Sequence, residues 1–237
     1  MIDFYYAPTP NGWKVAIMLE ECGLNFKTHL MSLDTGDQFQ KEFISINPNA
    51  KIPAIVDHDP PATFTGDKVS VFESAAILIY LGNKTGQFVQ SDPIKCKEMN
   101  EWLFWQVGNQ GPIAGQLSHF KNYAPEGHRH YGLARYLGEY KRNLAVLEKR
   151  LIDRDFILDE YSVCDILAFP WVFIARALGV SLDQFPNLAA WRNSIKERPA
   201  VVKAIDLHKG LQNHKNISVE TNSILFNQSE LNILDPS

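Results

Sequence analysis

Three short stretches of the sequence place polar side chains beside turns, where they could bind a small ligand. The stretches are APTPNGWK at residues 7–14, NPNAKIPAI at 47–55 and VFESAAILIYL at 71–81. In the first, Thr9 and Asn11 offer a hydroxyl and an amide where a short apolar segment turns into an expected helix. Because both groups donate hydrogen bonds, they could hold an anion at this turn.

The helix that begins near Pro10 would strengthen such an anion site. A helix N-terminus stabilises an anion by about 0.3–1 kcal/mol, and by up to ~2 kcal/mol when partly buried. A hydrogen bond to a charged sulfur contributes roughly 1.5–3 kcal/mol. Since one pKa unit corresponds to about 1.4 kcal/mol, the pKa of a bound thiol would fall by roughly one to three units, which populates thiolate near neutral pH. Thr9 as an ordinary N-cap with Pro10 at the first helical position is the simpler interpretation, and the two are compatible.

The dipeptide Glu73-Ser74 follows an expected strand and opens an expected helix. Ser74 is placed to cap that helix and to present free N–H groups to a ligand carboxylate. Glu73 beside it would attract a cation, so the pair suits a ligand that carries both charges. A plain N-cap next to a solvated acid is the alternative, and the dipeptide alone favours it.

Other chemistry receives little support from the sequence. Phosphate-loop, dinucleotide-binding, zinc-protease and α/β-hydrolase signatures are absent. His128 and His130 form a lone His-x-His without a third ligand, which favours exposed histidines over a metal site. Cys22, Cys96 and Cys164 are far apart and have no C-x-x-C spacing, so neither a disulfide framework nor zinc is indicated. We expect no metal.

Composition and charge restrict the partners. With 23 basic and 27 acidic residues, the net charge of −4 gives no cationic surface for nucleic acid or anionic lipid. No apolar run is long enough to span a bilayer, and the N-terminus lacks the pattern of a secretory signal, so we expect a cytoplasmic protein without a membrane partner. A length of 237 residues with 45% hydrophobic residues favours two globular domains.

The order of predicted elements gives the fold class. Residues 1 to about 85 read as β-α-β-α-β-β-α, with an X-Pro before the third strand, which fits a thioredoxin-like domain with helices on both faces of a four-stranded mixed sheet. Beyond residue 92 the strand signals disappear. Long helical patterns at 95–110, 130–152, 162–179 and 187–199 predict an all-helical domain, and the third is apolar on nearly every side.

The predicted organisation is therefore α/β plus all-α. We expect a thioredoxin-like domain at residues 1–86, an all-helical domain at 93–205, and a polar C-terminal tail at 206–237 that wraps the surface or is partly disordered. Ser162 and Asp165 have the spacing of a capping box at the start of the most apolar helix, which favours a buried structural role. Trp102, Phe104 and Trp105 are expected in the core or at a domain interface.

Together, the three stretches and the element order resemble the glutathione transferase superfamily over residues 1 to about 205. TPNG, KIPAIVDH and EWLFWQVG resemble in particular the bacterial Nu class, whose members are glutathione-dependent disulfide-bond oxidoreductases. The resemblance implies an N-terminal thioredoxin-like domain, a C-terminal all-helical glutathione-transferase domain, a homodimer, and glutathione as ligand, either reduced or as the disulfide. Cysteine-based relatives begin the first helix with C-P-x-C or C-P-x-S, whereas here Thr9 and Gly12 occupy those cysteine positions.

The resemblance also assigns roles at the sulfur and at the γ-glutamyl end. Thr9 and Asn11 would hold the glutathione sulfur, which makes the ligand the source of the thiol. Glu73 and Ser74 match the site that receives the ammonium and carboxylate of the γ-glutamyl group. Tyrosines serve as the sulfur donor in some glutathione transferases, so two residues at the end of the first strand are rival donors that we rank lower: Tyr5 and Tyr6.

The remaining assignments concern the rest of the tripeptide. The Ile52-Pro53 bond would be cis, and residue 52 would pair its N–H and C=O with the extended ligand. Gln38 would reach the glycine end and Lys51 would neutralise its carboxylate, with a solvated surface as the alternative for both. Arg135 would contact the ligand from the helical domain, unless it pairs with Glu139 one turn further on.

The function implied is thiol-disulfide exchange between glutathione and a small disulfide, with glutathione supplying all of the reactive sulfur. Conjugation of glutathione to a small electrophile is the alternative enzymatic function. A non-catalytic, glutathione-binding regulatory protein is the alternative from a different class.

Overall fold

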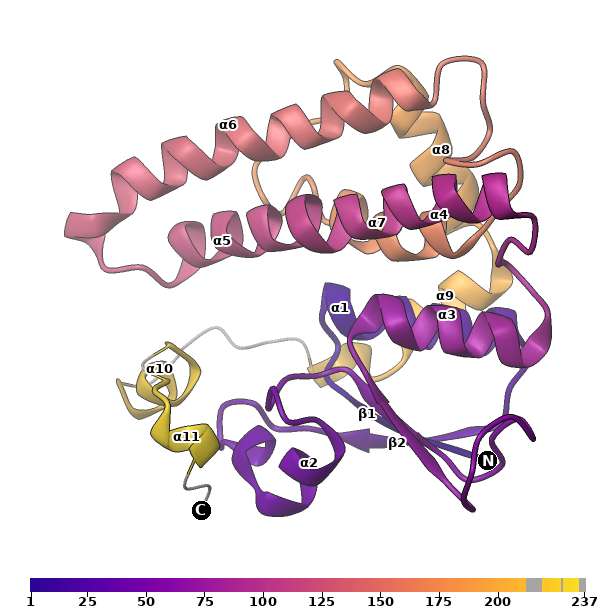
Figure 1. Ribbon diagram of the computed structural model, residues 1–237. Coiled ribbons are helices and arrows are strands. Elements are labelled where there is room, and N and C mark those ends of the chain that lie inside the picture. The colour runs from indigo at the N-terminus through magenta and orange to yellow at the C-terminus, as the bar shows by residue number, and fades with distance from the viewer. Residues whose placement is uncertain (212–218, 227, 235–237) are drawn as a thin grey trace. The chain divides into compact units, whose positions relative to one another are not determined.

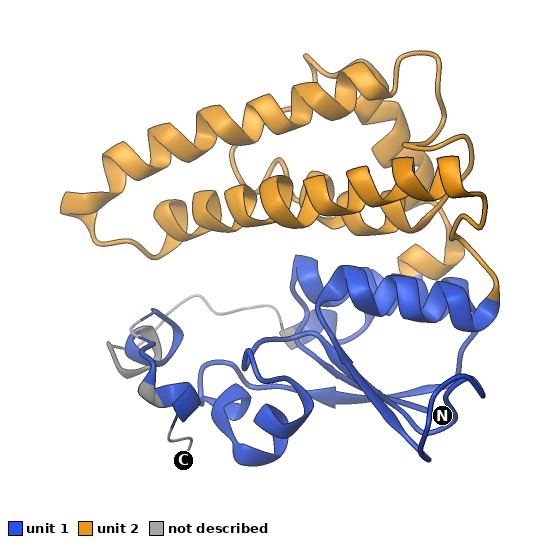
Figure 2. Cartoon of the chain, in the orientation of Figure 1, with its two compact units in different colours: residues 1–85, 203–237 blue, residues 86–202 orange. Residues whose placement is uncertain are grey.

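The structure is a computed structural model in which residues 1–211, 219–226 and 228–234 are described. Contacts divide the chain into two compact units, coloured separately in Figure 2. Unit 1 comprises residues 1–85 together with 203–237, and unit 2 comprises residues 86–202. The stretch expected to form a separate tail therefore groups with the first unit.

A four-stranded sheet forms the centre of unit 1 (Figure 1). Strand β1 (Ile2–Tyr6) runs parallel to β2 (Phe26–Leu30) and antiparallel to β3 (Ala54–Asp57), which pairs antiparallel with β4 (Val69–Phe72). The strand order is β2-β1-β3-β4. Every second residue of β1 faces the core, as the two-residue period of a strand requires. These buried residues are Ile2, Phe4 and Tyr6.

Helices connect the strands of unit 1 in the predicted order. Helices α1 (Pro10–Glu21) and α3 (Ser74–Thr85) pack against each other, and both lie above the sheet in Figure 1. The 3-10 turn η1 (Asp37–Phe39) and helix α2 (Lys41–Ile46) follow β2, and α2 packs against β3 and β4. The observed order β-α-β-α-β-β-α confirms the predicted thioredoxin-like fold.

The chain returns to unit 1 after the helical unit. The Tyr6 hydroxyl donates to the Leu207 carbonyl at 2.8 Å, and the Tyr6 ring lies 5.9 Å from that of His208. The predicted surface-wrapping or partly disordered tail includes residues 212–218, 227 and 235–237, which lie outside the described residues. The described elements of this return are α9 (Pro199–Asp206), which crosses the unit boundary, η3 (Lys209–Leu211), α10 (Val219–Phe226) and α11 (Leu231–Leu234).

The regular structure of unit 2 consists of helices among its described residues, as predicted. A five-residue π-helix, η2, joins two of them end to end. The elements are α4 (Pro93–Trp105), η2 (Gln106–Gln110), α5 (Gly111–Asn122), α6 (Glu126–Arg150), α7 (Val163–Phe173) and α8 (Pro186–Lys196).

Helix α5 is absent from the predicted helices because Gly111-Pro112 indicates the end of helical structure. In the structure, Pro112 occupies the first turn of α5, where its missing N–H is not needed for an intrahelical bond. Helix α6 begins four residues before the predicted pattern and therefore includes His128 and His130, which are both exposed as expected.

Helix α7 forms the core of unit 2. Its residues 163–172 are all buried, which confirms the central position predicted from its apolar sequence. The helix begins with the predicted capping box, in which Ser162 Oγ accepts from the Cys164 N–H at 3.3 Å and the Asp165 carboxylate accepts from the Ser162 N–H at 3.0 Å. In contrast, Phe104 on α4 is 72% exposed, so a core position is wrong for this residue.

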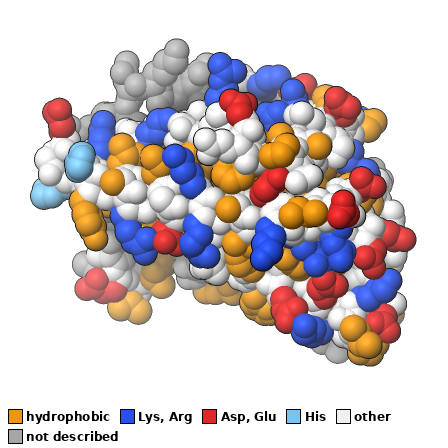
Figure 3. Space-filling model, turned by 90° about the horizontal axis from the view of Figure 1, so that it is seen from above, with side chains coloured by type: hydrophobic (Ala, Val, Ile, Leu, Met, Phe, Trp, Pro, Cys, Tyr) orange, Lys and Arg blue, Asp and Glu red, His pale blue; other side chains and the backbone are white. Residues whose placement is uncertain are grey.

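The surface carries both signs of charge. On the face drawn in Figure 3, lysine and arginine side chains are interspersed with aspartate and glutamate. Among the described residues, none of the helices combines the length and apolar character that crossing a bilayer requires.

Candidate active site

The sheet register brings the three sequence stretches to one end of unit 1. Tyr5 pairs with Ala54, and Ala54 pairs in turn with Phe72. Consequently the end of β1, the start of β3 and the end of β4 lie in a row across the sheet. The segments that adjoin these strand ends carry Thr9 and Asn11, Ile52 and Pro53, and Glu73 and Ser74.

Thr9 is the N-cap of α1, as predicted. Its Oγ1 accepts a hydrogen bond from the Gly12 N–H at 3.3 Å, its carbonyl accepts from the Trp13 N–H at 2.9 Å, and Pro10 occupies the first turn. Because the hydroxyl oxygen acts as an acceptor within the cap, its single proton can point outward. Thr9 and Asn11 are both partly exposed, so their polar atoms can meet a ligand.

Gly12 allows the first turn of α1 to approach β1 closely. A Cβ built on Gly12 would lie 2.2 Å from the Ala7 carbonyl oxygen and 2.8 Å from Tyr6 Cδ2. A backbone oxygen cannot move aside as a flexible side chain can, so this position of the C-P-x-C pattern excludes a side chain of any kind, including that of cysteine.

We predict that Gly12→Ala destabilises the protein by about 1–3 kcal/mol, the usual cost of overpacking. Gly138→Ala is the matched control, since Gly138 is exposed within α6 and has open space around its Cβ position. Alanine there should stabilise the helix by roughly 0.5–1 kcal/mol. Urea denaturation of both variants measures the two effects, and equal effects of the same sign would contradict the packing argument.

The two tyrosines of β1 are engaged elsewhere. Tyr6 is fully buried, its hydroxyl donates to Leu207, and burial raises its pKa to about 12. The Tyr5 ring stacks on His29 with a centroid distance of 4.6 Å. The hydroxyl of Tyr6 is therefore committed to a backbone acceptor within unit 1.

The Glu73-Ser74 corner lies directly beside α1. Glu73 is exposed and has a positive φ of 67°, whereas Ser74 is buried. The first backbone bond of α3 runs from the Ile77 N–H to the Glu73 carbonyl at 2.9 Å, so Glu73 occupies the cap position that we expected for Ser74. Ser74 Oγ instead accepts from Lys14 Nζ at 3.5 Å, which places the first turns of α1 and α3 together.

Lys14 is not among the candidate site residues predicted from the sequence. Burial lowers its pKa to about 7, although attraction to Glu73 opposes this shift. The available signal was a single charge inside the otherwise apolar run WKVAIML, whose residues 13–19 are all buried in α1. A lysine within a helix that is apolar on all sides indicates a specific partner.

The residues expected along the rest of the ligand lie near the same end of the sheet or outside unit 1. The Ile52-Pro53 bond is cis, as the resemblance implied, and Lys51 is exposed. Gln38 is 3% exposed; its Nε2 donates to the Leu33 carbonyl at 3.3 Å, and its buried Oε1 has no hydrogen-bond partner among the described residues.

Arg135 belongs to α6 in unit 2, on the exposed surface of that helix. Its Nη1 contacts Glu139 Oε1 at 2.7 Å, which is the i+4 ion pair considered as the alternative role. The Glu139 carboxylate also accepts from Arg142 at 3.1 Å and holds the pKa of Arg135 above its usual value.

The cysteines are free thiols with structural surroundings. Cys164 is buried, while Cys22 and Cys96 are partly exposed. Burial raises the pKa of both Cys22 and Cys164, which disfavours their thiolates.

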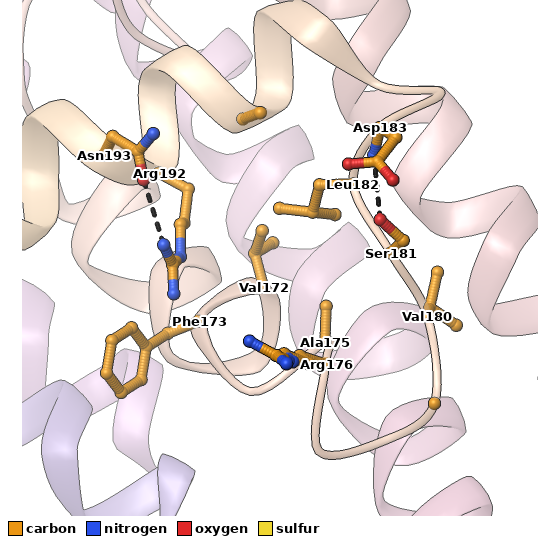
Figure 4. A pocket seen from close by; sticks show the side chains of 12 residues that line it. Val172, Phe173, Ala175, Arg176, Val180, Ser181, Leu182, Asp183, Arg192 and Asn193 are labelled. Carbon is orange, nitrogen blue, oxygen red and sulfur yellow. Dashed lines mark hydrogen bonds between the residues drawn. The ribbon is translucent and has the colours of Figure 1, made fainter.

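A cavity of about 680 Å³ lies within unit 2, at the end of α7 and along its connection to α8 (Figure 4). Its walls combine apolar side chains such as Val172 and Leu182 with Arg176 and Arg192. In Figure 4, Arg192 donates to Asn193 at 2.9 Å and lies over the Phe173 ring. All of the lining residues belong to unit 2, whereas the corners at Thr9 and Glu73 belong to unit 1.

Comparison with known protein families gives matches in both units. Residues 9–84 match the glutathione S-transferase N-terminal domain, and residues 131–194 match the glutathione S-transferase C-terminal domain. The chain is 43% identical to disulfide-bond oxidoreductase YfcG of Escherichia coli over 206 residues, which covers 86% of this chain and 94% of the relative. It is 38% identical to disulfide-bond oxidoreductase YghU of the same organism, covering 84% and 72% respectively.

Similar solved structures are also glutathione transferases. A glutathione transferase from Burkholderia graminis, with two glutathione molecules bound per subunit, is 44% identical with a TM-score of 0.82, and 88% of each chain is covered. A glutathione transferase from Pseudomonas putida, with one glutathione disulfide bound per subunit, is 39% identical with a TM-score of 0.80, covering 87% of this chain and 91% of that one.

Proposed function

This chain belongs to the glutathione transferase family, and on that premise we propose that it is a glutathione-dependent thiol-disulfide oxidoreductase that uses the thiol of bound glutathione. The observation that carries the proposal is the cap of α1, where Thr9 and Asn11 occupy the corner and Gly12 excludes a side chain. In support, the chain is 43% identical to a disulfide-bond oxidoreductase, and two solved relatives hold two glutathione molecules or one glutathione disulfide per subunit.

The proposed binding mode follows the row of segments at the sheet end. The glutathione sulfur lies at the α1 corner, where the outward proton of Thr9 and the amide of Asn11 donate to it. The γ-glutamyl carboxylate meets Ser74 and the N-terminus of α3, and its ammonium meets the exposed Glu73. Four residues are proposed along the remaining peptide, one of them from unit 2: Gln38, Lys51, Ile52 and Arg135. Pro53 shapes the segment that presents Ile52.

The chemistry is two successive exchanges. The thiolate of one glutathione attacks a sulfur of the substrate disulfide, which forms a mixed disulfide and releases the other substrate half as a thiolate. The thiolate of a second glutathione then attacks the glutathione sulfur of the mixed disulfide. Glutathione disulfide forms, and the second substrate half leaves as a thiolate that takes up a proton. The helix dipole and the donors of Thr9 and Asn11 lower the thiol pKa and so supply the attacking thiolate.

We predict that a variant without cysteine remains active. Cys22→Ser, Cys96→Ser and Cys164→Ala together should leave the kcat/KM for reduction of 2-hydroxyethyl disulfide by glutathione unchanged, because the reactive sulfur comes from the ligand. Circular dichroism and the melting temperature establish that the variant is folded. A folded variant that has lost the activity would overturn the ligand-thiol mechanism.

A regulatory function is the second candidate, since the chain is also 30% identical to transcriptional regulator URE2 of Saccharomyces cerevisiae over 241 residues, covering 85% of this chain and 66% of the relative. Turnover of 2-hydroxyethyl disulfide separates the two candidates. Binding of glutathione without turnover would favour regulation.

The proposal also includes the class within the family, the oligomeric state, the cellular location and the second substrate. Assignment to the Nu class, the homodimer and the cytoplasmic location rest on the sequence motifs and composition described above. A small disulfide is the proposed second substrate, with a small electrophile as the alternative, and neither nucleic acid nor membrane is a proposed partner.

A further inference from the structure

Lys14 is a buried cation beside the corner at which α3 begins. The residue is 2% exposed, and its Nζ donates to Ser74 Oγ at 3.5 Å. It also interacts electrostatically with Glu73, which lies next to Ser74. Lysine is almost never fully buried unless a partner compensates its charge. Ser74 and Glu73, which contribute to this compensation, are the two residues that the proposed function assigns to the γ-glutamyl end of glutathione.

The number of hydrogen-bond donors on Lys14 determines where the Ser74 hydroxyl proton can point. An ammonium has three N–H donors and no acceptor, so the Ser74 oxygen can only accept from it. The hydroxyl has one proton to donate, which must then point to a different acceptor. A neutral amine at Lys14 could accept that proton, and Ser74 would then donate inward. Protonation of Lys14 thus sets the direction in which Ser74 donates.

The neighbouring Glu73 is subject to the same charge. Its positive φ is uncommon for a residue other than glycine, and its carboxylate is exposed at the surface of the corner. A cation placed behind the corner attracts this carboxylate without competing for its exposed side. The ligand ammonium can then approach from solvent.

We propose that Lys14 is a positioning residue for the γ-glutamyl end of glutathione, fixing the Ser74 hydroxyl as a donor to the ligand carboxylate and holding Glu73 for the ligand ammonium. This inference rests on the proposed function, because it requires that Glu73 and Ser74 receive that end of the tripeptide. Lys14 itself acts from behind the two residues.

One consequence is a loss of affinity above neutral pH. Burial lowers the pKa of Lys14 to about 7, and Glu73, which precedes α3, is a charged group that opposes this shift. If the neutral form binds about tenfold more weakly than the charged form, the apparent Kd of the wild-type protein should be about fivefold higher at pH 8 than at pH 6.

Calorimetric titration with S-methylglutathione tests the inference, because this ligand keeps the γ-glutamyl group and has no titrating thiol. The variants are Lys14→Met, Ser74→Ala and the double variant, with Lys27→Met as a control on the exposed face of β2. Lys14→Met should raise the Kd at pH 6 about tenfold and remove the pH dependence. If Lys14 acts through Ser74, the double variant should bind no more weakly than the weaker single variant. The Lys27 control should match the wild type at both pH values.

Wild-type affinity and pH dependence in Lys14→Met would overturn this inference and leave the proposed function intact. Fully additive losses in the double variant would also overturn it, since they indicate independent structural effects. If Lys14→Met does not fold, Ser74→Ala decides: this variant should lose most of the pH dependence, with the rest acting through Glu73, and full wild-type pH dependence in Ser74→Ala would overturn the inference. Failure of the wild-type protein to bind S-methylglutathione would refute the proposed function together with this inference.

Discussion

Thr9→Val is expected to lower the kcat/KM for disulfide reduction about 10- to 100-fold. Valine keeps the shape of threonine but removes the hydroxyl that we propose as a donor to the glutathione thiolate. A hydrogen bond to a charged group contributes about 1.5–3 kcal/mol, and each 1.36 kcal/mol corresponds to roughly a factor of ten in rate. The pKa of the bound glutathione thiol should rise by about one to two units, which a pH titration of thiolate ultraviolet absorbance in the complex would record.

Thr9→Ser is the matched variant, since it retains both the hydroxyl and the N-cap of α1. It should keep most of the activity, whereas Thr9→Val also loses the cap and about 0.5–2 kcal/mol of stability. Measuring kcat/KM well below both melting temperatures separates the two effects. An unshifted thiol pKa in folded Thr9→Val would show that the hydroxyl does not hold the sulfur.

Asp165→Ala is expected to reduce the free energy of unfolding by about 4 kcal/mol or more. The buried carboxylate accepts from the Ile157 and Ser162 N–H groups at 2.9 and 3.0 Å, from Ser162 Oγ at 3.1 Å and from Trp191 Nε1 at 2.8 Å. Alanine leaves these donors buried without that acceptor, and each unsatisfied group costs about 1–3 kcal/mol. Against a typical total of about 5–15 kcal/mol, this loss is a large fraction of the stability, and urea denaturation would measure it.

The control for this variant is Asp159→Ala, the same change at an exposed aspartate whose side chain is 72% exposed. It should alter the unfolding free energy by less than about 0.5 kcal/mol. Similar losses in the two variants would contradict the role of the buried acceptor.

Asp165 should also contribute a pH dependence to stability. Burial raises its pKa to about 6 in the folded protein, although its four donors lower it, whereas an unfolded aspartate titrates near 3.9. The folded state therefore binds more protons between about pH 4 and pH 6, and the contribution of Asp165 to stability falls as the pH rises through that window. Asp165→Asn should remove this slope from the pH profile of urea denaturation.

The thioredoxin-like part of the fold could be predicted because its elements are short and sharply bounded. The apolar run IDFYY is followed by two prolines. Within KIPAIVD, the Ile52-Pro53 bond comes directly before the strand residues AIVD and separates them from the preceding helix. Each boundary residue excludes one backbone conformation, so the order of elements follows from local chemistry. Helix α7 was predictable for a related reason, since its capping box and continuous apolar sequence both indicate a buried start.

Features that depend on packing could not be predicted in the same way. Gly111-Pro112 indicates a break by its composition, yet the helical path continues through η2 into α5. Phe104 is aromatic but lies at the surface of unit 2. The contact between Lys14 and Ser74 joins residues 60 positions apart, and only the packing of α1 on α3 brings them together.

The hydrogen bond from the Tyr6 hydroxyl to the Leu207 carbonyl limits how early unit 1 can be completed during synthesis on the ribosome. Domains generally form during synthesis at about 5–20 residues per second, and residues 86–202 intervene between the two parts of unit 1. Tyr6 and Leu207 are 201 positions apart, so the first strand emerges roughly 10–40 s before its partner. During that interval the nascent sheet must persist without its C-terminal cover, or wait for the helical unit to be translated first.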